Sequence, residues 1–242
     1  MTKRAVVSLS GGMDSSSLLA VLLASKEYEF THCFAFDYGQ RHRVELERVQ
    51  ALIESLKPNF PVSLQIINLQ DVFSDSQSAL KESSGVAVPK EEYNEVNLRA
   101  TVVENRNVIF SSIIYAKALS ISKLYNCDVT ITLGVHNSDE AVYPDCRPQS
   151  TEMAKELFRI SNYGSERIEY WTPFITNTKT EVLGRGLTAL NELGLDSNQY
   201  YANTSSCYDP SPEGEACGKC ATCRDRLAAF EAYRMKDPVK YN

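Results

Sequence analysis

Hydrophobic positions in the first half of the chain follow two alternating patterns. Short, nearly continuous apolar runs, rich in β-branched and aromatic residues, predict buried strands at residues 4–9, 31–36, 62–69 and 129–134. Longer segments, in which apolar residues recur every three or four positions among polar ones, predict helices at residues 15–23, 43–56 and 107–124. Strands and helices therefore alternate along the chain.

This alternation predicts a parallel sheet, because a crossover helix is the usual way to return the chain to the same edge of a sheet. The expected fold is a doubly wound α/β sheet. Residues 74–98 are rich in Ser, Glu and Lys and show no sustained period, so we interpret them as a long excursion or a lid of the kind that orders on ligand binding. Residues 224–236 have the pattern of a short closing helix.

Composition narrows the class of protein. The chain has 242 residues, of which 43% are hydrophobic and 23% charged, as expected for one globular domain with a small appendage. A net charge of -6 argues against electrostatic binding of nucleic acid over a broad surface and favours a small-molecule substrate. We find neither a charged and apolar leader nor a run of eighteen apolar residues, so we expect a cytoplasmic protein without a membrane span.

A glycine-rich turn follows the first predicted strand and opens the first helix. It reads Ser-Gly-Gly-Met-Asp-Ser over residues 10–15. Two adjacent glycines let backbone N–H groups approach an oxyanion, and the helix N-terminus adds partial positive charge. The turn lacks the Gly-Lys-Ser/Thr ending of the Walker loop. The alternative reading is a plain Gly-Gly turn in which Asp14 only caps the helix.

The pattern Ser-Gly-Gly-x-Asp-Ser resembles the loop of the PP-loop ATP pyrophosphatases, an α/β class of the HUP type. Its members cut ATP between the α- and β-phosphates and adenylate a carbonyl or carboxylate oxygen. A second phrase, at residues 177–182, resembles a lysine-bearing segment of several PP-loop ligases, although a solvated helix start is an equal alternative for Lys179. The resemblance implies catalytic roles for Asp14, Ser10 and Lys179. It also implies that ATP with Mg²⁺ contacts Ser8, Leu9, Ser10, Gly11, Gly12, Met13, Asp14, Ser15, Ser16, Ser17 and Leu18.

Four of the seven cysteines lie near the C-terminus in the spacing C-x9-C-x2-C-x2-C: Cys207, Cys217, Cys220 and Cys223. In a reducing compartment such a cluster favours metal ligation over disulfides. Four thiolates suit a closed, tetrahedral structural zinc site, one per chain. An iron–sulfur cluster is the minority alternative, and free surface thiols are the least favoured reading.

Several phrases occur in the same order in the 7-cyano-7-deazaguanine synthase family, and the resemblance covers nearly the whole chain. They are the loop at 10–15, Phe-Asp-Tyr-Gly-Gln-Arg-His at 36–42, Glu-Asn-Arg-Asn at 104–107, Tyr-Pro-Asp-Cys-Arg-Pro at 143–148 and the cysteine tail. A departure is Glu104, where the family more often has Pro-Gly. The resemblance implies an ATP-dependent carbon–nitrogen ligase that makes a nitrile precursor of queuosine, a modified tRNA nucleoside, from 7-carboxy-7-deazaguanine and ammonia.

This family chemistry suggests roles for further residues. Arg106 and Arg147 would grip carboxylate or phosphate oxygens, and Asn105, Asn107 and Asp145 would hydrogen-bond the purine-like ring. Surface ion pairs are the plain alternative for the arginines, and a turn residue is the alternative for Asp145.

At the scale of the chain, we expect a ligase domain over residues 1–200, a zinc-binding tail over 201–242 packed on the same unit, and a homodimer. Rival hypotheses are another PP-loop ligase or tRNA-modifying enzyme, and a non-catalytic zinc-ribbon module that only retains the nucleotide loop.

Overall fold

A five-stranded parallel sheet lies at the centre of the molecule, in the order β3-β2-β1-β4-β5. The computed structural model describes residues 2–90, 97, 99–137 and 143–242. The strands are β1 (Lys3–Ser8), β2 (Phe30–Asp37), β3 (Val62–Asn68), β4 (Asp128–Leu133) and β5 (Ile168–Trp171). The predicted doubly wound parallel sheet is thereby confirmed.

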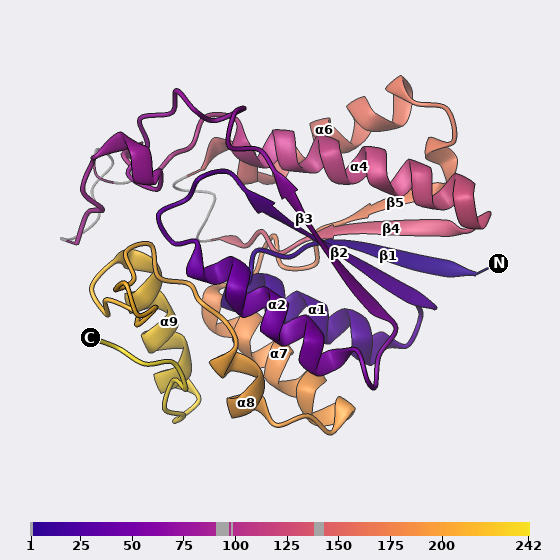
Figure 1. Cartoon of the computed structure of the whole chain (residues 1–242). Helices are drawn as coiled ribbons and strands as arrows, with labels where there is room; N and C mark the ends of the chain where they lie inside the picture. The colour runs from indigo at the N-terminus through magenta and orange to yellow at the C-terminus, as the bar shows by residue number, and fades with distance from the viewer. Residues whose placement is uncertain (1, 91–96, 98, 138–142) are drawn as a thin grey trace.

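Helices cover both faces of this sheet (Figure 1). One face carries α1 (Met13–Ser25), α2 (Val44–Leu56) and α7 (Lys179–Leu193). The other face carries α4 (Arg106–Tyr125) and α6 (Pro148–Ser161). The chain then continues through α8 (Ser197–Ala202) to α9 (Ala221–Ala232), and short 3-10 turns lie at Glu82–Ser84, Pro144–Cys146 and Ser165–Arg167.

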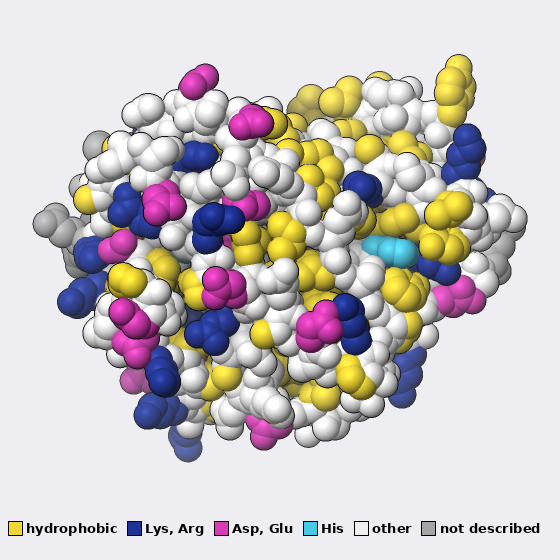
Figure 2. Space-filling view, in the orientation of Figure 1, with side chains coloured by type: hydrophobic (Ala, Val, Ile, Leu, Met, Phe, Trp, Pro, Cys, Tyr) yellow, Lys and Arg dark blue, Asp and Glu magenta, His cyan; other side chains and the backbone are white. Residues whose placement is uncertain are grey.

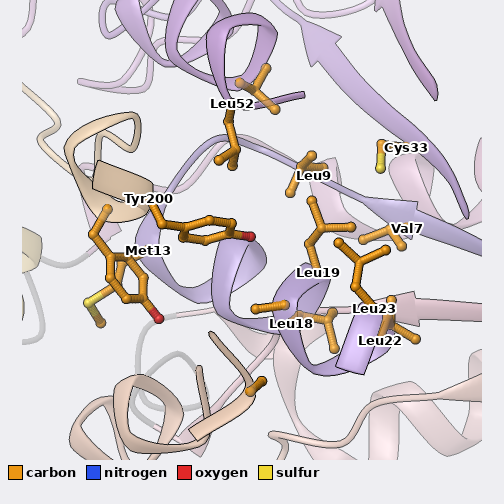
Figure 3. Packing of buried hydrophobic residues seen from close by; sticks show 14 of the residues in the cluster. Val7, Leu9, Met13, Leu18, Leu19, Leu22, Leu23, Cys33, Leu52 and Tyr200 are labelled. Atoms are coloured by element: carbon orange, nitrogen blue, oxygen red, sulfur yellow. The ribbon is translucent and has the colours of Figure 1, made fainter. Parts of the chain in front are cut away.

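The central strand β1 buries side chains on both faces of the sheet. Val7 faces the core under α1, whereas the adjacent Val6 faces the core under α4. Figure 3 shows the first of these cores, in which Leu19 and Leu22 of α1 lie near Val7, and Leu52 of α2 completes the layer. A strand buried on both faces reads as a continuous apolar run, which explains why the sequence pattern located β1 closely.

Helix α4 has the length and apolar composition of a membrane-crossing helix. A helix that forms one layer of a sheet protein meets the same criteria. The side chains of Ile114, Tyr115 and Ala118 are buried in the core that α4 shares with the sheet. Packing within the chain therefore accounts for part of its apolar character.

The segment predicted as an excursion is partly described. Residues 74–90 contain only one short 3-10 turn, yet Leu80 and Val88 are buried. The ammonium group of Lys81 donates a hydrogen bond to the backbone carbonyl of Tyr38, and the backbone N–H of Arg41 donates to Leu80 at 2.8 Å. Residues 91–96 and 98 lie outside the described residues, and ordering on ligand binding stays a prediction.

The direction of the chain across the sheet reverses at β1. From β1 the sheet extends through β2 and β3 to one side, and through β4 and β5 to the other. At such a topological switch point the loops that leave adjacent strands diverge and open a crevice at the carboxyl edge. The glycine-rich turn after β1 and Gly134 after β4 lie at this edge, where a Cβ on Gly134 would lie 3.1 Å from the backbone of Ser15.

Candidate active site and metal centre

The glycine-rich turn is a compact loop at the N-terminus of α1. Gly11 has φ +89°, and a Cβ at this position would lie 2.5 Å from the backbone oxygen of Glu45, so only glycine fits. The Ser10 and Ser15 hydroxyl oxygens lie 3.1 Å apart, and the N–H of Gly12 donates to Ser10 Oγ at 3.3 Å. Hydroxyls and N–H groups at a helix N-terminus form a site suited to phosphate oxygens.

Asp14 and Lys179 meet beside this loop. The Lys179 ammonium donates to Asp14 Oδ2 at 2.9 Å, and His136 Nε2 lies 3.6 Å from the same oxygen. Burial alone would raise the pKa of Asp14, but the charges of Lys179 and His136 outweigh it and hold this pKa well below its ordinary value. The carboxylate is therefore ionised across the physiological range. Lys179 is the first residue of α7, whose N-cap Thr178 forms a capping box with Glu181.

The segment between α8 and the cysteine cluster forms hydrogen bonds with the glycine-rich turn. The N–H of Ser205 donates to the Gly11 carbonyl at 2.8 Å, and the N–H of Met13 donates to Ser206 Oγ at 3.1 Å. Both loop residues are therefore fixed by a part of the chain almost 200 positions away. Cys207, the next residue, belongs to the cysteine cluster.

The opposite wall of the crevice comes from α4 and the Pro144–Cys146 turn. The Arg106 guanidinium lies between two rings, 5.6 Å from the centroid of Tyr38 and 5.5 Å from that of Tyr143. It also donates to the Tyr38 hydroxyl at 3.2 Å. Asn107 donates to Asp145 twice, from its backbone N–H and from its side-chain amide, each at 3.1 Å. This wall thus presents a fixed cation beside a fixed carboxylate.

One cavity joins the two walls, and the residues predicted from the sequence divide into three groups around it. Those that line the cavity are Ser8, Ser10, Gly12, Asp14, Ser15, Arg106, Asn107, Asp145 and Lys179. The residues Leu9, Gly11, Met13, Ser16, Ser17 and Leu18 lie behind the lining, mostly in the core. Asn105 and Arg147 are exposed and do not line it. The functional roles assigned to all of these residues stay predictions.

The cavity also contains residues that the sequence analysis did not assign. Tyr38 and His42 line it from the β2–α2 connection, and Glu45 lines it from the first turn of α2. Burial, aided by the charge of Arg106, lowers the pKa of His42 to about 3, so the imidazole is neutral. Burial raises the pKa of Glu45 to about 8. Two of the three lie in the Phe-Asp-Tyr-Gly-Gln-Arg-His phrase, but nothing in the sequence shows that this phrase faces the glycine-rich turn.

The four tail cysteines form a buried cluster. The sulfur atoms of Cys207, Cys217, Cys220 and Cys223 all lie within 4.8 Å of one another. Backbone N–H groups point at these sulfurs: Cys217 N donates to Cys207 Sγ at 3.2 Å, and Cys220 N donates to Cys217 Sγ at 3.3 Å. Such donors stabilise thiolates around a metal. The donor set and its closeness fit a metal ion held by four sulfurs.

The sheet, the loop at its switch point and the Asp14–Lys179 pair define a nucleotide-binding α/β protein of the PP-loop class. The family model described as "Queuosine biosynthesis protein QueC" matches residues 4–234. The chain therefore belongs to this family.

Two curated relatives extend the match. The 7-cyano-7-deazaguanine synthase of Hahella chejuensis is 38% identical over 98% of this chain and 93% of its own. That of Pseudoalteromonas translucida is 35% identical over the full length of both. Among solved structures, NMN synthetase from Francisella tularensis has a TM-score of 0.41 at 14% identity, covering 96% of this chain and 77% of that chain. The sequence matches alone carry the family assignment.

Proposed function

We propose that this chain is a 7-cyano-7-deazaguanine synthase, which converts 7-carboxy-7-deazaguanine and ammonia to the nitrile at the expense of ATP. The full-length relatives bear this name. The observation that carries the proposal is the single cavity, which places a phosphate-binding loop opposite Arg106, Asn107 and Asp145. An acyl adenylate needs such a site, because its phosphate and its acyl group must be held at once.

The loop side would stabilise the pyrophosphate that leaves ATP. The backbone N–H groups and the hydroxyls of Ser10 and Ser15 are fixed before the reaction, so they need no reorganisation as charge develops. Lys179 would neutralise phosphate charge. The ionised carboxylate of Asp14 fits Mg²⁺, which prefers oxygen ligands and would shield the phosphates when bound.

The opposite wall would hold the 7-carboxy-7-deazaguanine. Arg106 offers a planar guanidinium to the carboxylate, and its position between two tyrosine rings restricts its rotamers. Asp145 accepts hydrogen bonds and so suits the N–H edge of a guanine-like ring. Asn107 orients Asp145 through two hydrogen bonds.

The reaction takes place in two rounds of adenylation. In the first, the carboxylate attacks the α-phosphate of ATP, and ammonia then displaces AMP to give an amide. In the second, the amide oxygen is adenylated and leaves with AMP, which gives the nitrile. Both rounds use the same phosphate loop, so one cavity is sufficient.

We also propose that the cysteine cluster holds one structural zinc ion. Four thiolates leave no coordination position for water, which excludes a hydrolytic role for the metal. The buried sulfurs and the N–H donors around them support a closed site. An iron–sulfur cluster is the alternative that optical absorbance would reveal.

A cytoplasmic homodimer is the state that we propose for the enzyme. On α6, the exposed side chains of Met153, Leu157 and Ile160 follow one face of the helix at spacings of four and three. Figure 2 shows hydrophobic side chains over the part of the molecule where Figure 1 places α6. Ion pairs of Glu152 with Lys155 and Glu156 with Arg159 flank this face. Both signs of charge on one helix allow an antiparallel copy to pair with it across a two-fold axis.

The decisive experiment is to incubate the purified protein with ATP, Mg²⁺, ammonium and 7-carboxy-7-deazaguanine and to identify the products by mass spectrometry. We expect the nitrile, AMP and pyrophosphate. AMP formation with another carboxylate, but not with this one, would instead indicate a different PP-loop ligase. Nucleotide binding without turnover would indicate the non-catalytic module.

A further inference from the structure

Glu45 is a buried carboxyl group to which the proposed reaction assigns no role so far. It lies in the first turn of α2, and its residue is 8% exposed, yet it lines the cavity. Its Oε1 atom accepts a hydrogen bond from Gln40 Nε2 at 3.0 Å and lies 3.6 Å from His42 Nε2. A buried carboxyl group with free acceptor capacity at the edge of a ligand cavity is a site for a cation or a proton donor.

The location of Glu45 matches the junction of the proposed acyl adenylate. Its backbone carbonyl packs directly against Gly11 of the phosphate loop. On the other side, the Arg106 guanidinium is near enough to lower the pKa of the Glu45 carboxyl. Glu45 thus neighbours both the glycine-rich turn, which would hold the phosphates, and Arg106, which would hold the acyl carboxylate. The bond that ammonia must break, between carbonyl carbon and phosphate oxygen, forms between these two walls.

The surroundings of Glu45 also suit proton transfer. Burial raises the pKa of Glu45 to about 8. The hydrogen bond from Gln40 and the charge of Arg106 lower this pKa but do not outweigh burial. His42 lies 3.6 Å from the Glu45 carboxyl. The other titratable or charged side chains that line the cavity are Asp14, Tyr38, Arg106, Tyr143, Asp145, Cys146, Tyr170, Lys179 and Tyr208. A general base works best when its pKa is close to the operating pH.

We propose that Glu45 forms the binding site for ammonium and accepts the proton that ammonium loses before its nitrogen attacks the adenylate. This inference rests on the proposed function. The co-substrate that the site takes is a small nitrogen cation, for which the described part of the cavity offers the Glu45 carboxylate and the hydroxyls of Tyr38 and Tyr208.

The step balances without a further reactant. Ammonium transfers one proton to Glu45, and the lone pair of the resulting ammonia forms a bond to the acyl carbon. The carbon–oxygen bond to AMP then breaks, and the second proton leaves with the AMP phosphate. In the nitrile-forming round the amide nitrogen loses both of its protons. One leaves with the AMP phosphate, and the same carboxylate, after releasing its earlier proton to solvent, takes the other. The N–H electron pair becomes part of the new carbon–nitrogen bond as AMP departs.

The test separates adenylation from amine transfer. Exchange of labelled pyrophosphate into ATP, with 7-carboxy-7-deazaguanine but without ammonium, reports adenylation alone. For Glu45→Gln we expect exchange within about threefold of wild type, because the glutamine still accepts the hydrogen bond of Gln40. We expect kcat/KM for ammonium to fall by about 100-fold or more, the usual contribution of a general base. Glu47→Gln, an exposed glutamate of the same helical turn, is the matched control and should leave both values unchanged.

The pH profile distinguishes this role from a merely structural one. The deficit of Glu45→Gln should shrink as the pH approaches the pKa of ammonium, because free ammonia then needs no base. Glu45→Asp, which keeps a carboxylate, should recover part of the lost activity.

Equal loss of pyrophosphate exchange and amine transfer in Glu45→Gln, or full amine transfer at neutral pH, would overturn the proposal. Absence of exchange in the wild-type protein would overturn the proposed function itself and, with it, this inference.

Discussion

Lys179 and Asp14 are separated by 165 positions in the chain, and their side chains meet at the phosphate loop. We expect Lys179→Met to lower the rate of adenylation by about 100-fold to 1,000-fold, the loss typical of one preorganised electrostatic donor. Pyrophosphate exchange measures this rate. Lys123→Met, an exposed lysine near the end of α4, is the control and should retain wild-type exchange. Wild-type exchange in Lys179→Met would show that Lys179 only starts α7.

Glu45 has a measurable effect on stability as well. Its folded-state pKa of about 8 lies above the ordinary value of 4.5, so the folded state binds the proton more tightly than the unfolded state. Its stabilising contribution is therefore complete below pH 4.5 and is lost as the pH rises to about 8. We expect the thermal midpoint of wild type to fall relative to that of Glu45→Gln between pH 5 and pH 9. Calorimetry at several pH values measures the difference, and parallel curves would contradict the shift.

Side-chain identity at the site was visible in the sequence, but proximity was not. The Ser-Gly-Gly-Met-Asp-Ser turn was located because glycines, a preceding strand and a following helix are all local signals. Glu45 resembles any glutamate in the first turn of an amphipathic helix, where negative charge is common. Its burial depends on Gly11 and Arg106, which come from other parts of the chain. Contacts of this kind depend on the tertiary fold and produce no periodic pattern in the sequence.

At the scale of elements, Arg226 of α9 ties the C-terminal segment to the rest of the chain. Its guanidinium forms a bidentate pair with Asp237, at 2.7 and 3.0 Å, and donates to Thr204 Oγ1 at 2.8 Å. Both charged side chains are almost fully buried. Removing one partner leaves the other charge without compensation in the interior.

We therefore expect Asp237→Ala to lower the free energy of unfolding by about 3–5 kcal/mol. Denaturant titration followed by circular dichroism measures this change. Asp225→Ala, an exposed aspartate of α9, should change it by less than about 0.5 kcal/mol. A similarly small change for Asp237→Ala would show that water replaces the lost partner.

The sequence predicted the buried strands β1 to β4, the helices that connect them and the closing helix. The helix predicted at 107–124 corresponds to α4, and the closing helix predicted at 224–236 begins at Ala221 and ends at Ala232. The analysis missed β5, α6, α7 and α8. β5 has only four residues, one of them Glu169, so its apolar run is too short to stand out. On α6 the apolar face points to solvent, and the polar face dominates the composition of the segment.

At the scale of the whole molecule, the zinc proposal predicts a link between metal content and stability. We expect Cys220→Ser to lose the metal and to unfold at a lower temperature, because binding energy at a closed site contributes to folding free energy. Elemental analysis and thermal denaturation measure both effects. Cys127→Ala, a buried cysteine outside the cluster, should retain one metal per chain. Unchanged metal content in Cys220→Ser would refute the assignment.

The exposed face of α6 predicts the oligomeric state. We expect the wild-type protein to have the mass of a dimer in light scattering, and Leu157→Lys to shift it to a monomer, because burying the lysine charge disfavours the interface. Val72→Lys replaces a similarly exposed apolar residue elsewhere and should remain dimeric. A monomeric wild-type protein would show that α6 does not pair copies of this chain.

The hydrogen bonds between Ser205 and Ser206 and the glycine-rich turn link the two proposed binding sites. Cys207 follows directly, so the conformation that would hold the metal also holds Gly11 and Met13. Thermodynamic linkage is reciprocal: if the metal strengthens nucleotide binding, the nucleotide must strengthen metal binding by the same factor. Saturating ATP should therefore slow extraction of the metal by a chelator. The tail would then retain its metal more tightly when nucleotide is bound.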